Sequence, residues 1–286
     1  MSHTAGHRLD HLPPAASRLG AAFARPKWLA IACIVTLTCL GWLYLGLLAA
    51  DMDGVTGAIC SPTFGIALMP NGVWGVRGFA LIGLMWAAMT LAMMLPSAAP
   101  MILTYAEIAD TAASKSKAVV SPFVLTAGYT AVWLGFAVLA TLAQYALTRA
   151  VIIDAGVASV SGLFSGAILI GAGLYQFSAL KHACLKQCQS PFPFFFANWH
   201  TTPRGVFRLG VKQGLFCLGC CWAMMAVTFA VGIMNVIWMA GLGIVMTIEK
   251  IGTGKRFTYA IGVVSIAIGV VFVVTAVLAH WPGRAI

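Results

Sequence analysis

The sequence predicts an all-α protein, a polytopic bundle of transmembrane helices with about seven spans. Three observations support this fold class. Of the 286 residues, 61% are hydrophobic and only 8% are charged, whereas soluble domains average about 25% charged residues. The mean hydropathy of +0.95 is far too high for a disordered chain. Finally, seven apolar stretches approach the roughly 20 residues that a membrane helix needs.

The stretches cover residues 28–50, 78–102, 122–147, 158–184, 211–233, 236–249 and 258–280. The sixth is short and follows Asn235 closely, so a tight hairpin with the fifth, or a total of six spans, is the alternative. Within the second stretch, Pro96 and Pro100 are expected to kink or end the helix, because proline lacks a backbone N–H.

Two segments outside the spans complete the predicted organisation. Residues 1–27 are polar and form a predicted cytoplasmic tail, and residues 28–286 form one membrane domain. A cysteine-containing cytoplasmic loop is expected at about 184–210. Its segment 191–196 contains four phenylalanines and two prolines, which favours a position in the membrane interface or against the bundle.

The distribution of basic residues predicts the orientation. Of 17 lysines and arginines, only Arg77, Arg149 and Arg284 fall on one side of the spans, and the other fourteen fall on the opposite side. Basic loops face the cytoplasm, so the N-terminus is predicted inside and the C-terminus outside the bacterial inner membrane. This topology explains the net charge of +10, and nucleic-acid binding is not predicted.

Charged groups and catalytic motifs are missing from the middle of the predicted spans. Glu107, Asp110 and Glu249 all fall at cytoplasmic ends, and an intramembrane ionisable group is usual in proton-driven carriers. The sequence contains no phosphate-binding loop and no zinc-protease helix motif. It therefore indicates binding rather than turnover, and no catalytic residue is predicted.

Five cysteines gather at the predicted cytoplasmic ends of the fourth and fifth spans. They are Cys184, Cys188, Cys217, Cys220 and Cys221. Thiolates are soft ligands that suit Cu(I) or zinc, and the cytosol keeps thiols reduced. Nearby Lys181, Lys186 and Lys212 are expected to favour the thiolate form. At 100° per residue, Cys217 and Cys221 share a helix face, whereas Cys220 points about 60–100° away.

Stripes of glycine lead into both groups of cysteines. The residues are Gly162, Gly166 and Gly173 before Cys184, and Gly210 and Gly214 before Cys217. Membrane helices approach closely along such stripes. We therefore expect spans four and five to pack stripe to stripe and to bring Cys184, Cys217 and Cys221 together as a three-thiolate site.

Four further residues are weaker candidates for metal ligands: Met89, Met93, Met94 and His182. With Met85, the first two form a stripe at four-residue spacing. Thioethers bind Cu(I), although methionine also fills apolar cores. Cys33 and Cys39 of the first span are expected to serve only in packing.

Four motifs resemble one bacterial family, the domain of unknown function 2182, whose members are described as predicted metal-binding integral membrane proteins. The motifs are Met89-x3-Met93-Met94-Leu95-Pro96-x3-Pro100, Tyr175-Gln176-x3-Leu180-Lys181-x2-Cys184-Leu185-x2-Cys188-x-Ser190-Pro191, Gly214-x2-Cys217-x-Gly219-Cys220-Cys221-Trp222, and Trp238-Met239 to Glu249-Lys250. The likeness covers roughly residues 70–280. It implies a multi-span inner-membrane protein that binds metal.

The sequence thus predicts an inner-membrane protein that binds a soft metal, Cu(I) or alternatively zinc, through cytoplasmic-side thiolates. It would handle or deliver the metal, with the lipid bilayer and a membrane or soluble client as partners. Three alternatives remain open: a transporter of metal or a small solute, a redox protein with haem or an iron–sulfur cluster, and a structural membrane subunit.

Overall fold

The computed structural model describes residues 26–52, 75–115, 119–150, 162–233, 235–252 and 254–279. Over these ranges the chain is helical and has no strand, which confirms the all-α prediction. Nearly all of the predicted cytoplasmic tail lies outside the described residues, as do Arg284 and the C-terminus whose outside location was predicted.

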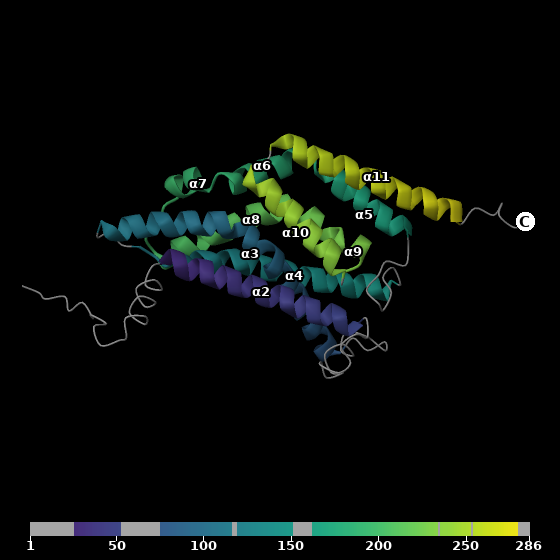
Figure 1. Ribbon diagram of the computed structural model, residues 1–286, viewed down its shortest axis with the longest axis horizontal. Helices are drawn as coiled ribbons and strands as arrows, with labels where there is room; N and C mark the ends of the chain where they lie inside the picture. The colour runs from purple at the N-terminus through teal and green to yellow at the C-terminus, as the bar shows by residue number, and fades with distance from the viewer. Residues whose placement is uncertain are drawn as a thin grey trace, which may run out of the picture.

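The helices pack side by side along the longest axis of the molecule (Figure 1). In chain order they are α2 (Pro26–Met52), α3 (Val76–Ser114), α4 (Pro122–Arg149), α5 (Gly162–Tyr175), α6 (Ala179–Gln189), α7 (Pro191–Ala197), α8 (Pro203–Ala226), α9 (Thr228–Val231), α10 (Val236–Ile251) and α11 (Lys255–Ala279).

The number of helices able to cross a membrane differs from the predicted seven. Among the described residues, five helical segments are long and apolar enough: those within α2, α3, α4 and α11, and α8 together with α9. A sixth is possible if α5 and α6, which are bent by 64° relative to each other, count as one span. Helix α10 has 16 residues, or about 24 Å at 1.5 Å per residue, which is short of the roughly 30 Å hydrocarbon core.

Two local features were predicted only in part. The prolines of the second span do not end it, because helix α3 continues through Pro96 and Pro100 to Ser114. Residues on either side of Pro96, such as Leu95 and Ser97, are buried, and this packing outweighs the missing N–H donors. The segment expected to be a loop at about 184–210 is mostly helical, since it contains the end of α6, all of α7 and the start of α8.

The aromatic segment folds back against the bundle, as one of the two interpretations predicted. It forms α7, whose Phe195 is fully buried. The ring of Phe195 packs edge-on against Tyr105 of α3, with ring centroids 5.5 Å apart. Tyr105 also stacks on Trp199. These aromatic contacts hold the segment between α6 and α8 against the end of α3.

The glycine stripes pack against partners other than those expected. Gly166 and Gly173 of α5 face Gly269 and Gly262 of α11, and a Cβ on either α5 glycine would lie 2.8 Å from the carbonyl oxygen of its partner. Gly210 and Gly214 of α8 face α4 instead. The expected contact between the two stripes is therefore wrong.

An interruption of the helix at residues 176–178 explains why the two glycine stripes do not contact each other. The 64° bend between α5 and α6 interrupts the helical phase, so the face that carries the α5 glycines does not continue into the face that carries Cys184. Helix α6, rather than α5, lies along the cysteine end of α8. The two groups of cysteines consequently still meet.

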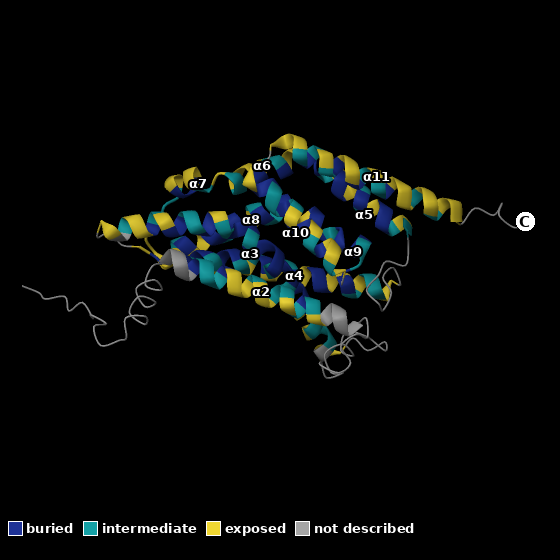
Figure 2. Ribbon diagram, in the orientation of Figure 1, coloured by how far each residue is buried: buried dark blue, intermediate teal, exposed yellow. Residues whose placement is uncertain are grey.

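Buried residues concentrate on the central helices, whereas α11 and the outer faces of α2 and α4 are largely exposed (Figure 2). The exposed side chains there are apolar, such as Leu40, Leu139 and Val271. The inner face of the bundle is formed mainly by α3, α8 and α10, and it is rich in sulfur-containing side chains.

Candidate metal site

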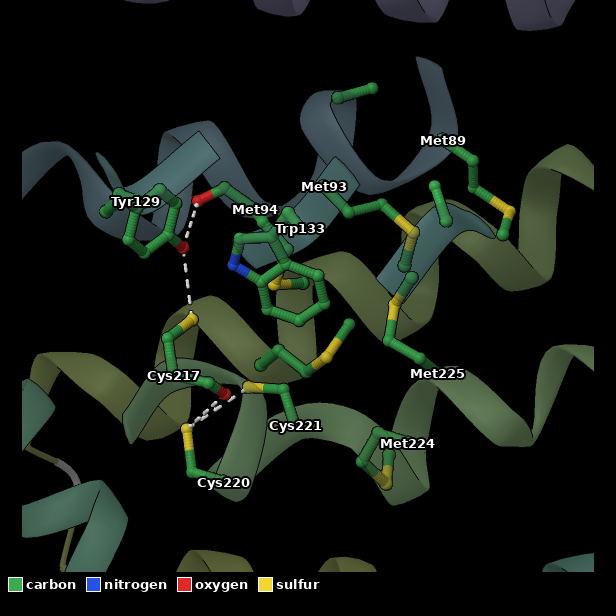
Figure 3. Packing of buried hydrophobic residues seen from close by; sticks show 14 of the residues in the cluster. Met89, Met93, Met94, Tyr129, Trp133, Cys217, Cys220, Cys221, Met224 and Met225 are labelled. Atoms are coloured by element: carbon green, nitrogen blue, oxygen red, sulfur yellow. Dashed lines mark hydrogen bonds between the residues drawn. The ribbon is translucent and has the colours of Figure 1, made fainter. Parts of the chain in front are cut away.

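Helices α6 and α8 bring four thiols close together. The Sγ atom of Cys188 lies 4.0 Å from that of Cys220, which lies 3.3 Å from the Sγ atom of Cys221. Figure 3 shows Cys217 about one turn of α8 before the neighbouring residues Cys220 and Cys221. The cysteines in the described residues are all free thiols, so each of the four is available as a ligand.

Cys217 has two polar neighbours from other helices. The Tyr129 hydroxyl of α4 lies 3.0 Å from Cys217 Sγ and donates a hydrogen bond to the Met94 carbonyl (Figure 3). The ammonium group of Lys250, at the end of α10, donates to Cys217 Sγ at 3.0 Å and to Ser97 Oγ at 2.6 Å. Three helices besides α8 therefore fix the surroundings of this thiol.

Lys250, and not the predicted Lys181, Lys186 or Lys212, places a positive charge beside the thiols. Its side chain is buried, whereas Lys186 and Lys212 are exposed, and Lys181 pairs elsewhere. A buried cation is costly unless an anion lies beside it. Cys217 is the thiol nearest to the ammonium group, so it is the best placed to exist as a thiolate.

A small cavity adjoins this thiol. It has a volume of about 20 Å³ and is lined by Ser97, Ala98, Met101, Tyr129, Cys188, Gln213, Cys217 and Lys250. Because a cavity needs about 10–15 Å³ to hold one water molecule, this one has room for a single small species. Gln213 Nε2, which lines it, has no hydrogen-bond partner within the described structure. Two thiols and one thioether thus border a space of the size of one ion.

The thiols form close pairs, but they are not arranged as a complete coordination sphere. In the part of the chain that the structure describes, no group of three or more Cys, His, Asp or Glu side chains is arranged to hold a metal ion. Side-chain rotation about the cavity is therefore needed before three thiols could share one ion.

The predicted three-thiolate arrangement of Cys184, Cys217 and Cys221 is not assembled. Cys184 Sγ packs beside Gly219, where an added Cβ would lie 2.7 Å from the sulfur. Cys220, which was predicted to point away, lies within reach of both Cys188 and Cys221. The reason is that α6 crosses α8 on the face that contains Gly219 and Cys220.

The weaker candidates divide into two groups. Met94 is next to the thiols, because its Sδ atom lies 3.9 Å from Lys250 Nζ, whereas Met89 and Met93 lie farther along the bundle (Figure 3). His182 is directed toward α11, where its ring packs edge-on against Tyr259 at 5.3 Å. His182 is therefore not part of the thiol cluster.

An ion pair beside the cluster was not predicted from the sequence. Lys181 Nζ of α6 lies 2.8 Å from Glu249 Oε2 of α10, with side-chain exposures of 0% and 1%. Gln189 Nε2 also donates to the Glu249 main-chain carbonyl at 2.7 Å. Both residues of the pair belong to motifs quoted above, but only their contact shows that they join α6 to α10.

A family model described as PpoB2, copper chaperone, matches residues 83–272. The matched range begins in α3 and ends in α11, and it includes the five clustered cysteines, Lys250 and the Lys181–Glu249 pair. The description of the matched family confirms a relation to copper, which was the predicted metal. No curated protein and no solved structure matches the chain significantly.

Proposed function

The chain belongs to the copper chaperone family, and we propose that it is an inner-membrane protein that binds Cu(I) as cargo and delivers it to a client protein. The ligands are drawn from Cys188, Cys217, Cys220 and Cys221. The observation that carries the proposal is the convergence of these thiols from α6 and α8, two of which, Cys188 and Cys217, line one small cavity.

The donor set favours Cu(I) over zinc. Thiols and a thioether are soft ligands, which suit Cu(I). Structural zinc sites almost always have four ligands in tetrahedral geometry. Among the described residues, no three or more Cys, His, Asp or Glu side chains are arranged to hold a metal ion. Two or three sulfurs are enough for Cu(I), and Cys188 and Cys217 already line the same small cavity.

Charge balance supports the same assignment. A Cu(I) ion bound by two thiolates has a net charge of −1, and the ammonium group of Lys250 beside Cys217 would bring the total to zero. A buried site without net charge avoids most of the desolvation penalty of an isolated ion. Lys250 thereby gains a role in holding the cargo without being a ligand.

The outer surface of the bundle supports a location in the lipid bilayer. The 18-residue apolar window of α11 has a mean hydropathy of 2.8 and is only 11% buried, and exposed apolar side chains of this density are stable in hydrocarbon, not in water. With the basic side facing the cytoplasm, the thiols lie toward the cytoplasmic end. Cys188 is only partly buried, whereas the other three thiols are buried, so Cys188 is the position where a client thiol would reach the cargo.

Replacement of both Cys188 and Cys217 by serine is expected to abolish tight Cu(I) binding. The decrease in affinity should exceed the roughly 10–100-fold that is lost when only a residue contacting a metal ligand is changed. Affinity is measured anaerobically on purified full-length protein by competition with a chromophoric Cu(I) chelator. Cys39→Ser, which changes an exposed thiol of α2, is the matched control. Unchanged affinity in the double variant would refute the proposed site.

Lys250→Met is expected to weaken Cu(I) binding by about 10–100-fold, because the negative charge of the bound complex would lose its partner. The same competition assay measures this change. Lys186→Met removes an exposed lysine of α6 and should leave the affinity unchanged. Equal affinities for the wild type and Lys250→Met would show that Lys250 does not balance the charge of the complex.

A further inference from the structure

The methionines in the described part of the chain are confined to its interior. Every methionine whose side chain the structure describes is buried. Leucine, a side chain of similar size, is found both in the interior and on the surface. Leu45 is fully buried, whereas Leu139 and Leu180 are 63% and 61% exposed. Methionines serving only as apolar filler should be distributed as the leucines are. Their confinement indicates that the sulfur atom, and not only the apolar volume of the side chain, matters at these positions.

Three of these thioethers lie together beyond the thiol cluster. Figure 3 shows Met93 of α3 and Met225 of α8 pointing toward one another, while Cys217 and Cys220 lie at the opposite side of the view. Met89 comes about one helical turn before Met93 in α3 and shares its face. At 1.5 Å per residue, Met225 lies about 6 Å beyond Cys221 along α8, and Met89 about 7–8 Å beyond Met94 along α3. The sulfur atoms thus continue from the thiols into the bundle.

Helix α10 leaves space beside these methionines, and a cavity next to α10 gives access to one of them. Gly243 faces Met93, since an added Cβ would lie 3.7 Å from Met93 Cγ. On the same side, an apolar cavity of about 340 Å³ between α2, α3 and α10 is lined by Met93, Pro96 and Gly243, among others. Pro96 has no N–H to donate to the carbonyl of Ala92, which also lines the cavity. Met93 is therefore accessible from this cavity.

We propose that Met89, Met93 and Met225 form a second, weaker Cu(I) site that holds the cargo one step away from the thiols. The proposal rests on the proposed function in that copper is the cargo. Thioethers are soft but neutral, so they select Cu(I) over zinc and bind it less tightly than thiolates do. Copper remains Cu(I) during transfer: one copper–thioether bond breaks, one copper–thiolate bond forms, and the thiol proton leaves to water.

Anaerobic titration of the full-length protein with Cu(I), again against a chromophoric chelator, tests this second site. The wild type should bind about two equivalents, one tight and one weaker, and should bind no zinc at the weaker site. The variant with Met89→Leu, Met93→Leu and Met225→Leu should lose the weaker equivalent and keep the tight one. Met-to-Leu changes nearly conserve volume, so the fold should survive.

Two further variants make the result decisive. Met224→Leu alters an equally buried methionine of the same helix, but its Sδ atom accepts a hydrogen bond from Gln176 at 2.7 Å and it points away from Met225 (Figure 3); both equivalents should remain. The double variant with Cys188→Ser and Cys217→Ser should lose only the tight equivalent. The experiment therefore distinguishes loss of the thiol site from loss of the thioether site. A single equivalent in the wild type, or an unchanged weaker equivalent in the triple variant, would overturn the thioether site.

Discussion

Glu249→Leu is expected to lower the free energy of unfolding by about 3–5 kcal/mol. The Glu249 carboxylate is the partner of Lys181, and both side chains are almost completely shielded from solvent. Removing one member leaves the Lys181 ammonium group buried without a counter-charge, and an unpaired buried charge is among the most destabilising changes in a protein. Unfolding in detergent, followed by helical circular dichroism, measures the loss.

The double variant Lys181→Met with Glu249→Leu separates the charge from the packing. Replacing a whole buried pair by apolar residues is often neutral, so most of the stability should return. Asp110→Leu alters an exposed acid of α3 and should change stability by no more than about 0.5 kcal/mol. If the double variant is as unstable as Glu249→Leu alone, the loss arises from packing and not from the unpaired charge.

Gly128→Ala or Gly210→Ala is expected to cost about 3 kcal/mol, the upper end of the usual range for overpacking. These glycines lie where α4 and α8 cross. An added Cβ at Gly210 would collide with the carbonyl oxygen of Leu125, and one at Gly128 with the carbonyl oxygen of Phe207. Backbone atoms of a neighbouring helix cannot rotate away as a side chain can, so the two helices must separate.

Gly135→Ala and Gly171→Ala are the matched controls. At both positions the added Cβ would have no atom from beyond its own helical turn within 4 Å, and both positions lie inside helices. Alanine is a better helix former than glycine by about 0.5–1 kcal/mol, so these variants should be unchanged or slightly more stable in the same unfolding experiment. Equal losses at Gly135 and Gly128 would argue against the close crossing.

The sequence by itself determined the properties that depend on composition and on helical periodicity. A chain with 8% charged residues and long apolar stretches has to form helices, since a helix satisfies its own backbone hydrogen bonds. The four-residue spacing of Met85, Met89 and Met93 correctly placed them on one face, and that face is buried. The gathering of cysteines near one end of two consecutive helical stretches was also visible, because it needs only the order of the helices.

Only the tertiary structure decided which faces meet. The bend after Tyr175 separates the phase of α5 from that of α6, so the α5 glycines pack on α11. For the same reason Cys188, rather than Cys184, is the α6 cysteine that meets a thiol of α8. Lys250 was read as one more basic residue of a cytoplasmic loop, yet it is buried against Cys217. Periodicity specifies which residues share a face of one helix. The neighbour of that face is set by long-range packing of small residues and by the need to pair buried charges.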